Sequence, residues 1–187
     1  STREPGGHNF LQPALIRPLV QQLQGTIVEC NTAYVGRRNT TAAHWETMKQ
    51  HGWSDAAPVD ILDEDGDMEL DIPAGKVIQK NYVGANLKNY DSLLVLSHLK
   101  GHPMGGFGGA LKNISIGIAS SRGKQYIHGA GDMDKFWDAE HDSFLEAMAD
   151  AAWSVHNHFK GKAAYLSIMK NMSVDCDCCA VAADPKI

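Results

Sequence analysis

Apolar residues recur at two spacings along the chain, and the first of these is helical. Leucines stand at every fourth position from Leu11 to Leu23, which puts them on one face and predicts a helix over 10–24. Gly25 would end this helix, and Pro18 is a position where it is expected to kink. The chain therefore begins with an amphipathic helix.

Two further helices are predicted downstream. The first covers 41–51, with Asn39 or Thr40 as its N-terminal cap and Gly52 as its stop. The second is long and covers 138–160. Its apolar stripe consists of Phe144, Met148, Ala152, Val155 and Phe159.

The second spacing is that of strands. Short apolar or alternating runs predict strands over 26–30, 58–62, 68–72, 92–97 and 163–169. The run "SLLVLS" over 92–97 is nearly continuous, which is typical of a strand covered on both faces. Strands that alternate with helices predict an α/β fold with a layered, mainly parallel sheet and helices on both faces. We expect one domain over 1–187.

Composition narrows the class of protein. Of 187 residues, 43% are hydrophobic and 21% charged, which are the values of a globular chain. A net charge of −5, with no basic run longer than two residues, argues against a nucleic-acid binder. No apolar run reaches the ~18 residues of a membrane span, and no targeting segment is evident. Clustered cysteines favour a reducing, cytoplasmic location. Both ends read as interior sequence, so we expect a fragment of a longer chain, and its oligomeric state stays open.

The segment 97–117, "SHLKGHPMGGFGGALKNISIG", concentrates candidate chemistry. His98 and His102 are four residues apart and would share one helical face as metal ligands. Gly101 and Pro103 argue against a regular helix here, so the pair can equally be hydrogen-bonding loop histidines. Both alternatives stay open from the sequence.

Glycines and amines follow these histidines. Four glycines permit close backbone approach to an anion or a flat cofactor: Gly105, Gly106, Gly108 and Gly109. They match neither the dinucleotide fingerprint nor the P-loop. Lys112 can be a covalent anchor, an anion ligand, a base or a solvated surface charge, and His128 is equally ambiguous.

A cysteine cluster near the end of the sequence, "DCDCC", is the candidate metal site. Thiolates at the spacing of Cys176, Cys178 and Cys179 can bind an iron–sulfur cluster, zinc or copper. Two or three ligands do not complete such a site, so Cys30 or residues outside this chain would have to contribute. The alternative is a set of unpaired thiols.

Three segments with candidate chemistry directly follow predicted strands. Residues 31–38, 98–113 and 175–179 follow strands at their carboxyl ends, where the functional sites of α/β sheets usually lie, so they can converge on one crevice.

The acidic segment "DEDGD" over 63–67 lacks the glycine and glutamate positions of a calcium-binding loop, and we predict a β-turn there.

Long motifs carry a family resemblance. "VLSHLKGHPMGGFGGALKNISIGIASSRGK", "EPGGHNFLQPALI", "GTIVECNTAY", "ILDEDG" and "SVDCDC" resemble, in this order, the DUF362 family, described as uncharacterised iron–sulfur centre proteins. The resemblance covers essentially the whole chain. It implies metal or iron–sulfur binding, with Cys176 and Cys178 as the expected ligands.

A more distant resemblance concerns the nickel-pincer lactate racemase family. His102, "GGFGG", Lys112 and His128 stand in the order of that family's histidine, glycine turn, cofactor-bearing lysine and nickel-binding histidine. "STREP" is similar to its substrate segment, which implies that Arg3 binds a carboxylate.

One departure from the racemase pattern limits what this resemblance implies. "NTAYVGRR" offers Tyr34, Arg37 and Arg38 where the racemase has a second catalytic histidine. Two-base racemisation is therefore not expected, although a retained cofactor pocket is.

Three functions compete at this point. The first is a metal or iron–sulfur protein with a redox role and a redox partner, in which His98 and His102 line the crevice of the cysteines. The second is an enzyme for a small carboxylate, a hydroxy or oxo acid, with a nickel-containing cofactor held by Lys112 and His128 and with Arg3 or Arg37 on the acid. The third is a non-catalytic binding module.

Overall fold

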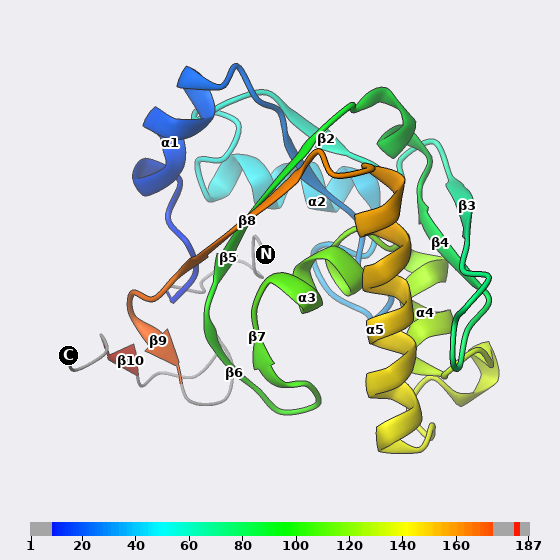
Figure 1. Cartoon of the computed structure of the whole chain (residues 1–187). Coiled ribbons are helices and arrows are strands. Elements are labelled where there is room, and N and C mark those ends of the chain that lie inside the picture. The colour runs from blue at the N-terminus through cyan, green and yellow to red at the C-terminus, as the bar shows by residue number, and fades with distance from the viewer. Residues whose placement is uncertain (1–8, 174–181, 184–187) are drawn as a thin grey trace.

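A computed structural model describes residues 9–173 and 182–183 of the chain (Figure 1). The α-helices are α1 Pro13–Gln22, α2 Thr41–Gln50, α3 Ala110–Lys112, α4 Ser121–His128 and α5 His141–His158. The strands are β1 Ile27–Glu29, β2 Val59–Ile61, β3 Asp67–Asp71, β4 Lys80–Gly84, β5 Leu93–His98, β6 Lys100–His102, β7 Gly106–Gly108, β8 Ala163–Ile168, β9 Met172–Ser173 and β10 Ala182–Ala183. A π-helix, Asn113–Gly117, follows α3, and 3₁₀ turns cover Ala85–Asn89 and Met133–Lys135.

The three predicted helices and five predicted strands are present. The helices, β1, β2 and β8 are shorter than predicted, whereas β3 and β5 have the predicted length and are shifted by one residue. α1 begins at Pro13 because proline is favoured in a first helical turn, and Pro18 lies inside the helix. Thr40 caps α2 by accepting the N–H of Ala43. The glycine-rich stretch yields elements that the pattern does not predict, since β6, β7 and α3 are only three residues long.

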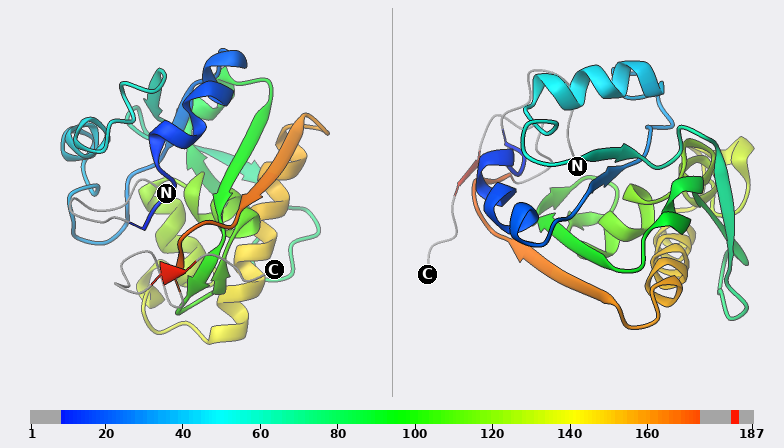
Figure 2. Two further views of the ribbon diagram at one scale, coloured as in Figure 1. Left: turned by 90° about the vertical axis from the view of Figure 1, so that its left-hand side faces the viewer. Right: turned by 90° about the horizontal axis from the view of Figure 1, so that it is seen from above.

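The α/β class is confirmed by two parallel strand pairs with helices on both sides. β1 pairs with β2, and β5 pairs with β8 over six residues from Leu93↔Ala163 to His98↔Ile168. α3, α4 and α5 lie on one side of the β5–β8 pair, with α1 and α2 on the other (Figures 1 and 2). β3–β4, β6–β7 and β9–β10 are antiparallel. Among the described strands, pairing is two by two rather than in one continuous sheet.

The alternation of side chains along β5 divides the core. Val95 points to a cluster that contains Ala152 and Val155 of α5. Leu96 points the opposite way, into a cluster that contains Ile16 and Val20 of α1. Because successive strand residues face opposite sides, one strand joins the two helical layers.

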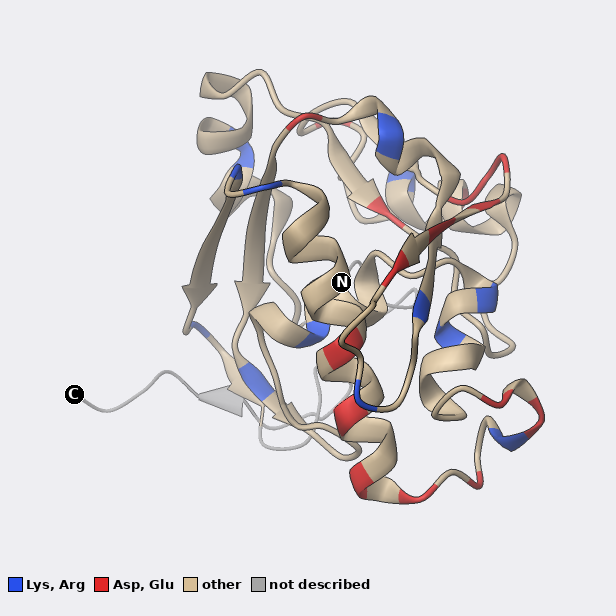
Figure 3. Ribbon diagram, turned by 45° about the vertical axis from the view of Figure 1, so that its right-hand side comes forward, with Lys and Arg blue, Asp and Glu red and all other residues tan. Residues whose placement is uncertain are grey.

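Many of the acidic residues lie on the outer surface of the fold. Figure 3 shows carboxylates along β3 and on the outer side of α5. Several of them pair with cations, as Glu146 does with Lys76 and Glu69 with Lys80, but these pairs are exposed and stabilise the fold little. In the part of the chain that is described, no helix combines the length and apolarity that a bilayer crossing requires.

A close backbone contact positions α4 against β4. A Cβ on Gly123 would lie 1.9 Å from the carbonyl oxygen of Tyr82, so only glycine permits this approach.

We expect Gly123→Ala to lower the free energy of unfolding by about 2 kcal/mol or more, as overpacking does. Gly117→Ala is the matched control, since a Cβ there meets nothing within 4 Å. Urea denaturation of both variants tests this, and equal stabilities would contradict it.

Candidate functional site

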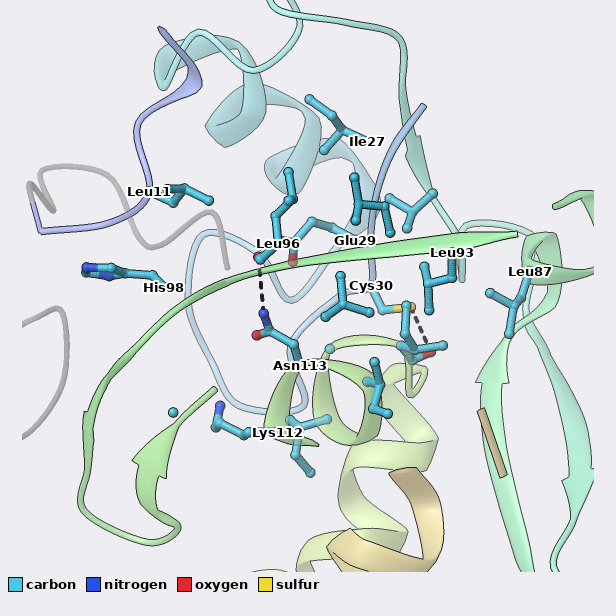
Figure 4. Close-up of a pocket in the computed structure, with 18 of the residues that line it drawn as sticks. Leu11, Ile27, Glu29, Cys30, Leu87, Leu93, Leu96, His98, Lys112 and Asn113 are labelled. Atoms are coloured by element: carbon cyan, nitrogen blue, oxygen red, sulfur yellow. Dashed lines mark hydrogen bonds between the residues drawn. The ribbon is translucent and has the colours of Figure 1, made fainter. Parts of the chain in front are cut away.

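A cavity of about 780 Å³ opens between β1, β5, α1 and the α3–π-helix segment (Figure 4). Its wall includes four Lys and Arg side chains, namely Arg38, Lys100, Lys112 and Lys124. Three histidines share the wall, namely His98, His102 and His128. Among the described residues, two carboxylates share the wall with them, those of Glu29 and Asp91. The cavity is therefore suited to an anionic ligand, although the chain as a whole is acidic.

His98 and His102 both reach this cavity, but not from one helical face. His98 is the last residue of β5, and His102 is the last residue of β6. The helical alternative is therefore wrong, because the glycine at 101 and the proline at 103 accompany an extended segment that turns into the β6–β7 hairpin. His98 Nε2 donates to the carbonyl oxygen of Lys170, which joins the end of β5 to the segment after β8.

The ring of His102 organises the hairpin turn. Its Nδ1 accepts hydrogen bonds from the backbone N–H groups of Met104 and Gly105, at 3.2 and 3.0 Å. A neutral His102 with this acceptor carries its proton on Nε2. An Nε2–H tautomer does not fit a metal ligand in this arrangement.

The four glycines have separate roles. Gly106 has φ +69, a backbone conformation that favours glycine, and it makes the turn of the hairpin. Gly108 lies on the cavity wall, where a Cβ would stand 3.0 Å from Lys100 Cε. Gly105 and Gly109 are not on the wall, and the Gly105 amide is bonded to His102. Binding of a cofactor by these glycines stays a prediction, now centred on Gly108.

Lys112 and His128 reach the cavity from two consecutive helices. Lys112 ends α3 directly before the π-helix, an element that is frequent at functional sites. His128 Nδ1 donates to the carbonyl oxygen of Lys124 at 2.7 Å, and its ring lies against Phe136 and Phe144. Burial lowers the pKa of His128, so the ring is neutral and Nε2 is its acceptor atom. A histidine oriented in this way fits a metal ligand.

The exit of β1 presents Arg38 rather than Arg37. The N–H of Thr32 donates to the carbonyl oxygen of Arg38, which closes the loop and turns Arg38 inward until 5% of it is exposed. Its Nη2 donates to the hydroxyl of Tyr34 at 3.4 Å, and both residues line the cavity. Arg37 is exposed and lies outside the wall. The carboxylate-binding role expected of Arg37 therefore fits its neighbour.

Lys124 is a wall residue that the sequence reasoning missed, because no helix was predicted over α4. It is 6% exposed, its Nζ donates to the carbonyl oxygen of Ala119, and burial lowers its pKa. The "SRGK" run, in which glycine adjoins a lysine, was the available signal.

Cys30 does not fit the role of a thiolate ligand. Its Sγ donates to the carbonyl oxygen of Ile118 at 3.2 Å, and burial raises the pKa of the thiol far above its ordinary value. Cys30 therefore stays protonated and is not the residue that completes a metal site. Its role is apolar packing beside Leu62 and Val83.

The remaining metal candidates lie outside the described residues. These are Cys176, Cys178 and Cys179, and Arg3 of the expected substrate segment is outside them as well. Within 9–173 and 182–183, no group of three or more His, Cys, Asp or Glu side chains is arranged to hold an ion. β9 and β10, which flank the cysteines in sequence, pair with each other, and β9 lies beside β6.

The acidic turn over 63–67 is confirmed and has a structural role. The N–H of Gly66 donates to the carbonyl oxygen of Asp63, which closes the β-turn. The Asp63 carboxylate accepts the backbone N–H of Asn31 at 2.9 Å and that of Ser121 at 3.0 Å. Asp63 thereby joins the exits of β1 and β2 to the start of α4.

The fold and cavity define the class: an α/β domain with a cationic pocket at the carboxyl end of a parallel strand. Residues 1–187 match the family described as "Domain of unknown function (DUF362)". The chain belongs to this family. Comparison with curated proteins and with solved structures returns no match.

A buried histidine behind the β1 exit predicts a pH dependence of stability. His44 is fully buried, its Nδ1 donates to Asn31 Oδ1 at 3.1 Å, and its Nε2 has no hydrogen-bond partner among the described residues. Burial lowers its pKa from 6.5 to about 4. Between these values the unfolded chain binds a proton that the folded chain does not, so stability falls as pH drops from 6.5 towards 4.

The stability lost to this protonation is at most about 3 kcal/mol. We expect His44→Gln to flatten the pH dependence of the free energy of unfolding over this interval. His156→Gln, at a surface histidine, should leave the dependence unchanged. Denaturant titrations at pH 7 and pH 4.5 measure this difference, and parallel curves for wild type and His44→Gln would refute it.

Proposed function

We propose that this DUF362 domain binds a small hydroxy or oxo acid in the cationic cavity and acts on it with a cofactor anchored at Lys112. The observation that supports this best is the excess of positive charge on the cavity wall, where four Lys and Arg residues and three histidines face two carboxylates. A carboxylate in such a pocket forms charge-assisted hydrogen bonds, which are about twice as strong as neutral ones.

Each wall residue has a role that suits its chemistry. Arg38 binds the carboxylate of the acid, because a guanidinium presents a planar pair of donors and the loop holds it inward. Tyr34, which the Arg38 guanidinium contacts, orients that pair. His102 donates its Nε2–H to a hydroxyl or carbonyl oxygen of the ligand.

The anchor of the cofactor lies at Lys112 and His128. Lys112 supplies an amine for a covalent link, and the His128 Nε2 atom is a suitable ligand for a nickel or similar ion. A bound metal cofactor would supply Lewis-acid or redox chemistry to the acid. Lactate racemisation is not proposed, because Tyr34 and Arg38 occupy the segment where a second base would stand.

The matched pair of arginines tests the binding of the acid. We expect Arg38→Lys to weaken the binding of pyruvate or lactate by about tenfold, since it removes a planar pair of donors. Arg37→Lys should leave the affinity unchanged, because Arg37 is outside the wall. Titration calorimetry measures both, with thermal unfolding as the check that Arg38→Lys folds. Equal affinities of the two variants would refute the proposed role of Arg38.

A second candidate function is an iron–sulfur or other metal protein with a redox role and a redox partner. The pairing of β9 with β10 and the position of β9 beside β6 favour it, because these elements bring the residues next to the cysteines towards His102. The ligands would be Cys176, Cys178 and Cys179, with His98 near the same edge. This function also agrees with the resemblance to the DUF362 family, whose members are described as uncharacterised iron–sulfur centre proteins.

Elemental analysis of protein purified without oxygen separates the two functions. In the first, nickel and added mass at Lys112 are lost in Lys112→Ala and kept in the double variant Cys176→Ser/Cys178→Ser. In the second, iron and sulfide are lost in the cysteine variant and kept in Lys112→Ala. Lys88→Ala, at an exposed lysine, is the control for both. Metal that survives in both variants would refute both assignments and favour a non-catalytic binding module.

A further inference from the structure

β5 is paired along one edge only. The N–H of Leu93 donates to the carbonyl oxygen of Lys162, and that of Leu99 donates to Ile168, so the odd-numbered residues of this parallel ladder bond to β8. In a parallel pair the groups of alternate residues point to opposite edges. The backbone N–H and C=O groups of Leu94 and Leu96 therefore point away from β8, and no described strand pairs with them.

The cavity runs along this second edge. Leu93 and Val95 have side chains on one face of β5, and Leu94 and Leu96 have theirs on the other, yet all four residues line the cavity. A cavity that contacts residues of both faces meets the strand at its edge. Among the described residues, the side chain of Asn113 meets this edge: its Nδ2 donates to the Leu96 carbonyl oxygen at a long 3.4 Å (Figure 4).

β1 presents a similar edge to the same cavity. The N–H of Ile27 donates to Pro58, and the carbonyl oxygen of Glu29 accepts from Leu62, so the odd-numbered residues of β1 bond to β2 and its neighbour loop. Val28 and Cys30, whose backbone groups point the other way, line the cavity. Apolar side chains from α1, including Leu11 and Ile16, complete this part of the wall.

We propose that this edge receives an extended, apolar peptide segment, which adds to β5 as a parallel strand and ends in a carboxylate. Strand addition satisfies the backbone groups of Leu94 and Leu96, and it covers Leu94, which is 36% exposed. A segment parallel to β5 places its carboxyl end at the His98 end of the strand, where Lys100 and Lys112 line the cavity. The charge of the cavity wall therefore specifies both the direction of the segment and its acidic end.

The strand proposal rests on the proposed function in one respect, the use of the lysine–histidine end of the cavity as an anion site. Its occupant differs, because an extended peptide uses the backbone of β5, which a small acid does not. The two ideas therefore predict different consequences when peptide amides and peptide charges are changed separately.

The probe is the peptide acetyl-Ser-Val-Ile-Val-Thr-Asp with a free carboxyl end. Amide exchange of the chain, measured residue by residue by NMR with and without the peptide, is expected to slow at least tenfold at Leu94 and Leu96. The amide of Val95 is an internal control, because the ladder directs it to β8 and its exchange should not change. Unchanged exchange at Leu94 and Leu96 under saturating peptide would overturn the proposal.

Two N-methylated peptides provide the sharpest test. One is methylated on the amides of its second and fourth residues, and the other on those of its third and fifth. Strand addition to one edge predicts that one pattern weakens binding at least tenfold and the other has little effect, because only alternate amides face β5. Equal effects of the two patterns would refute strand addition without any change to the protein.

A third peptide, with Asn for Asp and an amidated end, separates this proposal from the proposed function. We expect about tenfold weaker binding, and Lys112→Gln should remove that difference between the acidic and the neutral peptide. Alternation without charge dependence would overturn the anion site and keep the added strand. Protection of Leu94 and Leu96 that rises with protein concentration, without peptide, would assign the edge to a second copy of the chain and overturn the peptide.

Discussion

The parallel pairing of β5 with β8 is the constraint on which the rest of the structure depends. It fixes which side chains of β5 face α5 and which face α1, so it joins the two clusters of the core. It also fixes where β5 ends. His98 is held there by the carbonyl oxygen of Lys170, and the β6–β7 hairpin with His102 follows at once. A one-residue slip of this ladder would exchange the two faces and move the histidines away from the cavity.

The site combines a cationic wall with a chain of negative net charge. Carboxylates are placed over β3 and the outside of α5, and exposed lysines pair with several of them there. Arg38 is instead buried next to the cavity, where a lower dielectric makes its charge act more strongly on a ligand. Two histidines accompany it: Nδ1 of His102 accepts from the hairpin backbone, and His128, whose pKa burial lowers, donates from Nδ1 and can accept at Nε2. A pocket of this kind can bind an anion and hold a proton at a defined atom.

Backbone hydrogen bonding explains why the sheet and the cavity coexist. The β1–β2 and β5–β8 pairs each turn an edge, that of β1 and that of β5, towards the same cavity. There the Asn113 side chain donates to the carbonyl oxygen of Leu96. The cavity is accordingly lined by strand backbone as well as by polar side chains. This feature distinguishes it from a pocket formed only by loops at the end of a closed sheet.

The sequence determined three of the helices and the parallel strands, because apolar periodicity reflects which residues are buried. α1, α2, α5, β1, β2, β5 and β8 follow from apolar spacing, and the β-turn at 63–66 follows from its glycine and acidic residues. The sequence also singled out His102, Lys112 and His128 as candidate site residues, and the structure brings all three to one cavity. The family assignment is carried by the same motifs.

Only the tertiary structure decided which polar residues share the site. Arg38 and Arg37 are adjacent and chemically equal in sequence, but the bond between Thr32 and the Arg38 carbonyl turns one inward and leaves the other exposed. Cys30 is a candidate ligand by type and becomes a buried thiol by packing. The short strands of the glycine-rich segment were not predictable, because β6 and β7 consist mainly of glycine and polar residues and carry no apolar pattern. β6 also lies beside β9, which is distant in sequence, and local sequence does not specify such a contact.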